Sequence, residues 1–125
     1  MSKILKIRAR QVFDSRGTPT IEAEVYSKNL SASAICPSGA STGTHEAFEK
    51  RDNNNKRYLG KSVLNAVKLI NTKISKKLSG KNIHDQTRID TILINLDGTR
   101  QKTNLGANAI LAVSMAAKKL SAKIN

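Results

Sequence analysis

The spacing of apolar residues changes once along this chain, and that change limits the possible fold more than any other feature. In the N-terminal segments, apolar side chains occur at every second position, as in a β-strand with one buried face. In the later segments they occur at every third or fourth position, as in an amphipathic α-helix. The alternating segments are residues 4–13, 20–26 and 31–36, and the helical ones begin near residues 61, 85 and 107. The sequence therefore predicts three strands followed by three helices.

The first alternating segment also predicts which face of the sheet is buried. In residues 4–13 the apolar members share one face and the basic members the other: Leu5, Ile7, Ala9 and Phe13 against Lys6, Arg8 and Arg10. Strands joined by short, turn-rich connections form an antiparallel meander with one polar face. A sheet this small is stable only with a cover on its apolar face. We therefore predict an α+β domain, a three-stranded antiparallel meander followed by a helical layer.

The helical segments carry start and stop signals. Gly80 is placed to end the first helix, since glycine readily takes the left-handed conformation that follows a helix. Asp85 is a plausible N-cap for the second helix, and Asp97 with Gly98 closes it. A third helix from about Ala107 has apolar residues directed inward: Ile110, Leu111, Val113, Ala117 and Leu120.

Composition limits the partners and the compartment that we expect. The 125 residues include 22 Lys and Arg and 9 Asp and Glu, a net charge of +13. The basic residues are spread along the chain and only 3% are aromatic, so we do not expect nucleic-acid binding, although a basic module that binds nucleic acid or acidic surfaces stays an alternative. A single cysteine, Cys36, forms no internal disulfide. No apolar run is long enough to span a membrane and no signal peptide is evident, so we predict a cytoplasmic protein.

One loop-like stretch follows the third strand and has no bulky side chain. It is residues 37–43, made of Pro37 followed by Ser38, Gly39, Ala40, Ser41, Thr42 and Gly43. Its glycines permit close approach of the backbone to a ligand, and its hydroxyls suit an anion or a hard metal ion. A flexible surface loop is the simpler interpretation. The stretch also matches G-x-S-x-G, but it lacks the strand–turn–helix context of a hydrolase nucleophile.

Four stretches of the chain, in this order, resemble the N-terminal domain of the enolase family. They are residues 14–20 (DSRGTPT), residues 37–52 (PSGASTG with EA and RD after it), residues 59–67 (LGK with AV), and residues 96–114 (LDGT with GANAILAVS). The resemblance covers nearly the whole chain. It implies a three-stranded meander followed by helices, in agreement with the residue pattern.

The resemblance also implies a function and several site residues. Enolases interconvert 2-phosphoglycerate and phosphoenolpyruvate, and divalent Mg²⁺ stabilises the charge that develops on the substrate. By resemblance, residues 37–43 form a lid that closes over substrate, and Ser41 ligates the second Mg²⁺. Arg10 and Glu22 correspond to residues that form ion pairs across a homodimer interface.

The residues that carry the central chemistry are expected outside this chain. In the family, a (β/α)₈-type barrel follows the N-terminal domain and supplies the base, the acids and the remaining metal ligands. Such a barrel needs roughly 250 residues, so residues 1–125 are interpreted as a single domain without the catalytic barrel. We therefore expect these residues alone to be inactive, as part of a full-length enzyme. A non-functional truncated product is the alternative.

Overall fold

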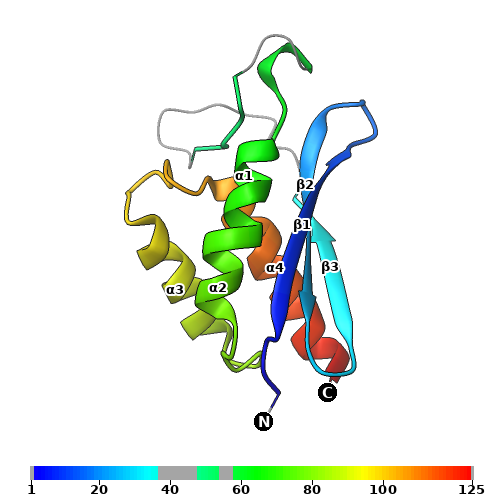
Figure 1. Ribbon diagram of the computed structural model, residues 1–125, viewed down its shortest axis with the longest axis vertical. Helices are drawn as coiled ribbons and strands as arrows, with labels where there is room; N and C mark the ends of the chain where they lie inside the picture. Colours follow the sequence, from blue (N-terminus) through cyan, green and yellow to red (C-terminus); the bar gives the residue numbers. More distant parts are fainter. Residues whose placement is uncertain (1, 37–47, 54–57, 125) are drawn as a thin grey trace.

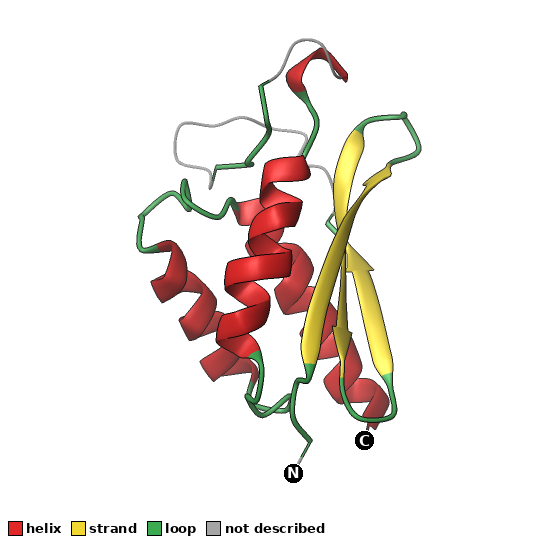
Figure 2. Cartoon of the chain, in the orientation of Figure 1, coloured by secondary structure: helices red, strands yellow, loops and turns green. Residues whose placement is uncertain are grey.

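The computed structural model describes residues 2–36, 48–53 and 58–124. These residues form a sheet and a layer of helices, as Figures 1 and 2 show. The elements are β1 (Lys6–Phe13), β2 (Pro19–Tyr26), β3 (Ser31–Ile35), η1 (Tyr58–Gly60), α1 (Leu64–Leu69), η2 (Ile70–Ile74), α2 (Ser75–Leu78), α3 (Gln86–Asp97) and α4 (Ala107–Ile124). The predicted α+β order of strands and then helices is confirmed.

The three strands form an antiparallel sheet in the order β1-β2-β3. The turn between β1 and β2 is held by Asp14, whose Oδ1 accepts hydrogen bonds from the backbone N–H groups of Arg16 and Thr18, both at 2.9 Å. Gly17 has a φ of 77°, in the left-handed region that glycine adopts without strain. These contacts fix the register, in which Arg10 lies opposite Glu22.

The apolar face of the sheet packs on α4. In β2, Ile21, Ala23 and Val25 are completely buried. The facing side of α4 consists mainly of small residues, which allow the helix to approach the sheet closely: Ala109, Ala112, Val113, Ala116, Ala117 and Leu120 are all buried. Burial of this aliphatic core is the main favourable term for folding, since apolar area contributes roughly 25 cal/mol per Å².

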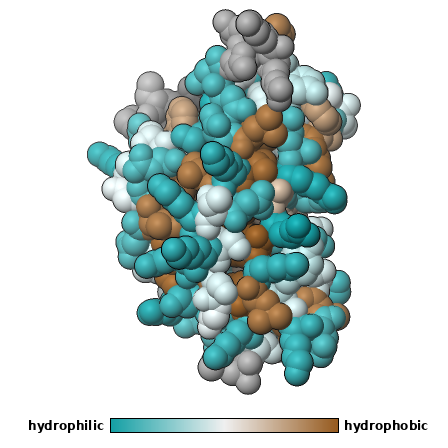
Figure 3. Space-filling model, viewed as in Figure 1, coloured by the Kyte–Doolittle hydropathy of each residue, from teal (hydrophilic) through white to brown (hydrophobic). Residues whose placement is uncertain are grey.

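Three side chains that the pattern predicts to face inward are exposed. Leu5 is 55% exposed, Phe13 49% and Leu111 42%. Leu5 precedes β1, and Phe13 is the last residue of β1. Phe13 instead meets the ring of Tyr58 edge-on, at 5.1 Å between centroids. Figure 3 shows that hydrophobic residues are exposed among hydrophilic ones on the face that it draws.

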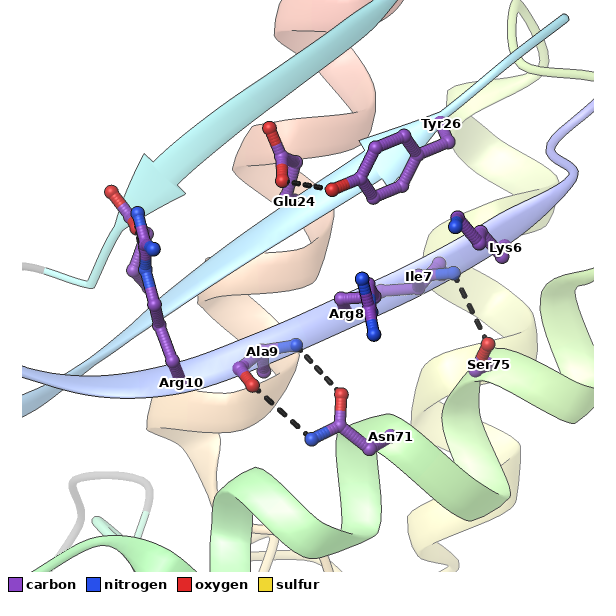
Figure 4. A pocket seen from close by; sticks show the side chains of 10 residues that line it. Lys6, Ile7, Arg8, Ala9, Arg10, Glu24, Tyr26, Asn71 and Ser75 are labelled. Atoms are coloured by element: carbon purple, nitrogen blue, oxygen red, sulfur yellow. Dashed lines mark hydrogen bonds and ion pairs between the residues drawn. The ribbon is translucent and has the colours of Figure 1, made fainter.

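The free edge of β1 is covered by side chains of a helix. Ala9 N–H donates to Asn71 Oδ1 at 2.7 Å and Asn71 Nδ2 donates to Ala9 O at 3.1 Å. Ile7 N–H donates to Ser75 Oγ at 3.1 Å, and Ser79 Oγ donates to Leu5 O at 3.2 Å (Figure 4 shows Asn71 and Ser75). The helical residues that cover the edge are four positions apart and the strand residues that they contact are two positions apart, so both sets recur on one side of their element. This cover hides strand groups that would otherwise pair with another chain.

The first predicted helix contains a segment that the pattern did not indicate. Residues 64–78 continue without a break through α1, the π-helical η2 and α2. A π segment has wider hydrogen-bonded turns than an α-helix, and Asn71 lies within it. The caps of α3 are as predicted, because the Asp85 side chain accepts from Arg88 N–H and Gly98 is left-handed at the C-cap. Among the described residues, no helix is both long and apolar enough to span a membrane.

Candidate functional site

The predicted lid, from Ser38 to Gly43 and including Ser41, lies outside the described residues. What the structure describes is the frame on either side of it, namely the segment that ends at Cys36 and residues 48–53. Both parts lie at the end of the domain where β3 stops and where α1 and α4 begin (Figure 1). The candidate site is therefore built here from the contacts of this frame.

The N-terminal side of the frame is fixed to β2. Cys36 N–H donates to Ile21 O at 2.9 Å, and Thr20 Oγ donates to Cys36 O at 2.9 Å. Thr20 and Cys36 are both buried. Burial raises the pKa of the Cys36 thiol to about 11, with Glu49 raising it further and Arg51 opposing. The thiol is therefore protonated at neutral pH, and it serves as a small buried side chain rather than a nucleophile.

The C-terminal side of the frame is fixed to the start of α4. Phe48 N–H donates to Gln101 O and Ala107 N–H donates to Phe48 O, both at 2.6 Å. The buried Asn108 side chain makes a paired contact with the backbone of Lys50. Its Oδ1 accepts from Lys50 N–H at 3.0 Å and its Nδ2 donates to Lys50 O at 3.0 Å. One amide side chain thus satisfies both polar groups of a peptide segment that has no strand partner.

Gly106 is required by the same contact. Its φ is 93°, and a Cβ built at this position would lie 2.5 Å from Lys50 Cβ and 2.5 Å from Asn108 Oδ1. The absent side chain lets residues 48–53 approach the helix start. Any other residue would combine backbone strain with a clash.

Arg51 joins three parts of the frame. Its guanidinium donates to Pro19 O at 2.9 Å and to Lys61 O at 2.5 Å, and it forms an ion pair with Glu49. Its side chain is only 17% exposed, so these are partly desolvated, charge-assisted contacts. They tie the segment after the predicted lid to the start of β2 and to the approach to α1.

The N-terminus of α1 is capped from a distance. Asp52 accepts hydrogen bonds from Leu64 N–H at 3.1 Å and Asn65 N–H at 2.9 Å. Gln11 of β1 accepts from Val63 N–H at 2.8 Å. The first N–H groups of a helix need such partners, and a carboxylate there also meets the positive end of the helix dipole. Sequence reasoning missed this cap, because Asp52 is twelve residues from the helix start and has no local signature.

A buried carboxylate organises the loop that leads to Gly106. Asp97 accepts from Thr99 N–H at 3.0 Å and from Leu105 N–H at 2.7 Å, and Thr99 Oγ also donates to it. Burial alone would raise the pKa of Asp97, but these hydrogen bonds together with nearby Lys102 lower it overall. The ionised carboxylate therefore holds the 98–106 loop in the shape that places α4 beside the frame.

The described residues do not form a metal centre by themselves. No group of three or more His, Cys, Asp or Glu side chains among them is arranged to hold a metal ion. Of the two histidines, His45 is outside the described residues, and His84 Nδ1 lies 2.6 Å from Ser121 Oγ on the surface.

Arg10 and Glu22, the predicted dimer-interface residues, pair with each other. Arg10 Nε donates to Glu22 Oε1 at 2.5 Å across the β1–β2 register, and the Arg10 side chain is 75% exposed. They line a hollow of about 720 Å³ on the polar face of the sheet, which Figure 4 shows. A hydrogen bond to Glu24 is the main cause that raises the pKa of Tyr26 in this hollow. Their role at a dimer interface stays a prediction.

The fold and the frame together define a class of protein: an α+β domain that fixes both ends of a loop rich in Gly, Ser and Thr. The fixed points are the ends of the sheet strands and the N-termini of α1 and α4. Loops that carry function are commonly positioned by a rigid scaffold in this manner.

Comparison with known proteins identifies the family. Residues 4–125 match the family described as enolase, N-terminal domain. The chain is 90% identical over 124 residues to the enolase of Pelagibacter ubique (strain HTCC1062), an alignment that covers 99% of this chain and 30% of that relative. The chain therefore belongs to the enolase family, as its N-terminal domain. The family resemblance predicted from the sequence is confirmed.

Proposed function

We propose that this chain is the N-terminal, loop-bearing part of an enolase, the lyase that reversibly dehydrates 2-phosphoglycerate to phosphoenolpyruvate. The observation that carries the proposal is the family match, with 90% identity to a curated enolase. The chain spans 30% of the length of that relative. The base, the acids and the remaining metal ligands are therefore assigned to a barrel domain outside these residues.

Within this function, residues 37–43 are proposed as the lid over bound substrate, with Ser41 as a ligand of the second Mg²⁺. Serine offers a hydroxyl and a backbone carbonyl oxygen, both of which suit a hard cation. When bound, the metal would offset negative charge that develops on the substrate. The contacts of Cys36 and Asn108 support the proposal, because they fix the described segments on either side of residues 37–47 to the folded domain. Closure would exclude water and strengthen the electrostatic interactions inside.

The isolated chain is proposed to be inactive and the full-length protein to act as a cytoplasmic homodimer. Arg10 supports the dimer proposal, because its exposed guanidinium on the polar sheet face can still reach a second protein. In isolation, such an exposed ion pair contributes only ~0–1 kcal/mol to stability.

The test is reconstitution with the rest of the enzyme. The chain would be co-expressed with the complementary part of the Pelagibacter ubique relative, and phosphoenolpyruvate formation from 2-phosphoglycerate followed by ultraviolet absorbance. We expect turnover from the complex and none from the chain alone. A folded complex without turnover would contradict the assignment as part of the enzyme.

A second arm of the test isolates the lid. Ser41→Ala in the complex should lower kcat on the order of a hundredfold, the size of effect seen when a group that stabilises developing charge is removed. Ser33→Ala, at an exposed position of β3, is the matched control and should have no effect. Full activity of Ser41→Ala would refute the ligand role while leaving the family assignment intact.

A further inference from the structure

A groove of about 720 Å³ lies on the helical side of the domain. It lies between the helix that ends at Leu78 and the C-terminal end of α3. Its lining consists of basic side chains on one side and of polar and apolar ones on the other: Lys73, Lys76, Lys77, Ser79, Lys81, Leu96, Asn104 and Leu105.

The charge of this groove is uncompensated. Of the eight described residues that line it, four are lysines and none is acidic. The ammonium groups of these lysines take part in no ion pair with the described residues. Like charges gathered in this way repel one another, and an anionic partner relieves that repulsion. The composition gives only the total net charge, +13. The fold gathers part of that charge on one surface.

The floor of the groove is apolar. Leu105 is 2% exposed and Leu96 is partly buried against the core. Lysine stems add further methylene surface while their charged ends stay at the rim. The groove therefore offers an apolar strip bordered by positive charge, the complement of an amphipathic segment that carries acidic residues beside apolar ones.

We propose that this groove binds an acidic amphipathic segment of a partner protein. Lys73, Lys76 and Lys77 lie within about one helical turn of one another, so their charges are concentrated along one side of the groove, opposite Leu96 and Leu105. A nucleic acid fits less well, because the described residues of the lining include neither an aromatic side chain for base stacking nor an arginine. The positive charge would also accelerate encounter with an acidic partner at low salt.

The experiment measures binding of a defined probe to the full-length protein that contains these residues. The probe is a fluorescent 14-residue peptide with leucines at helical spacing and glutamates between them, followed by fluorescence anisotropy. A second peptide keeps every glutamate and has serine in place of each leucine. A 20-nucleotide oligouridylate is the third probe.

The variant replaces Lys73, Lys76, Lys77 and Lys81 by Gln. The charge-matched control replaces four other exposed lysines, namely Lys28, Lys68, Lys118 and Lys119, by Gln. Because one exposed ion pair changes an affinity by roughly two- to fivefold, we expect the groove variant to bind the leucine peptide at least about tenfold more weakly. The control loses the same four positive charges, and we expect its affinity for the leucine peptide to stay within about twofold of the parent's.

Four results would overturn the proposal. The first is that the parent protein does not bind the leucine peptide. The second is that the two lysine variants lose the same affinity for it. The third is that the oligouridylate binds more tightly than the peptide and depends on the same lysines. Equal binding of the serine peptide is the fourth result that would overturn the proposal, because the apolar residues of an amphipathic segment would then contribute nothing. Unfolding curves for both variants confirm that the domain remains folded, and these outcomes are independent of enolase activity.

Discussion

The paired contact between Asn108 and Lys50 gives the sharpest prediction about the frame. Asn108→Ala removes two hydrogen bonds of 3.0 Å each and leaves both polar groups of a partly buried backbone unit without them. A hydrogen bond contributes about 1 kcal/mol net, and an unsatisfied buried group costs about 1–3 kcal/mol. We therefore expect the free energy of unfolding to fall by about 2–3 kcal/mol.

The matched control is Asn95→Ala on the exposed face of α3. Both substitutions exchange a helical Asn for Ala and gain similar helix propensity, so their difference isolates the contact with Lys50. Urea unfolding monitored by circular dichroism gives the two free energies. Hydrogen exchange supplies a local measurement, in which the Lys50 amide should exchange at least about tenfold faster in Asn108→Ala. Equal stability of the two variants, within about 0.5 kcal/mol, would show that Asn108 does not hold the frame.

Three further predictions concern other parts of the same end of the domain. Gly106→Ala should destabilise by about 2–4 kcal/mol in urea unfolding, whereas Gly80→Ala, at a φ of 87° with open space around it, should cost only about 1 kcal/mol; similar values would refute the close approach. Because the folded pKa of Asp97 is lowered, its contribution to stability is present above the unfolded pKa, about 4, and is lost as the pH falls through the folded value. Asp97→Asn should flatten the acid side of the stability profile, and an unchanged profile would contradict this. Cys36 should resist thiol reagents at pH 8 in the folded protein and react once urea unfolds it; rapid reaction in the folded state would show that the thiol is accessible.

The order of elements was predictable because each signal for it is local. Alternation of apolar residues marks strands, spacing of three or four marks helices, and Asp85 and Gly98 mark the ends of α3 through contacts within four residues. The same local logic failed at Leu5, Phe13 and Leu111. Their positions fit the repeat, but burial requires another element to cover the side chain, and these three side chains remain 42–55% exposed.

Only the tertiary structure decided the contacts between residues far apart in the chain. Asn71 covers the edge of β1 from 62 residues away, and Asn108 holds Lys50 from 58 residues away. An Asn in a helix has no periodic signature for such a role, since exposed and bridging amides look alike in sequence. The groove lined by Lys73 and Lys81 became evident only when Leu96 of α3 and Leu105 of the following loop supplied its apolar side. The sequence by itself thus determined the elements and the family, because both depend on local pattern. Packing determined the frame, the covered edge and the groove, because these depend on which elements meet.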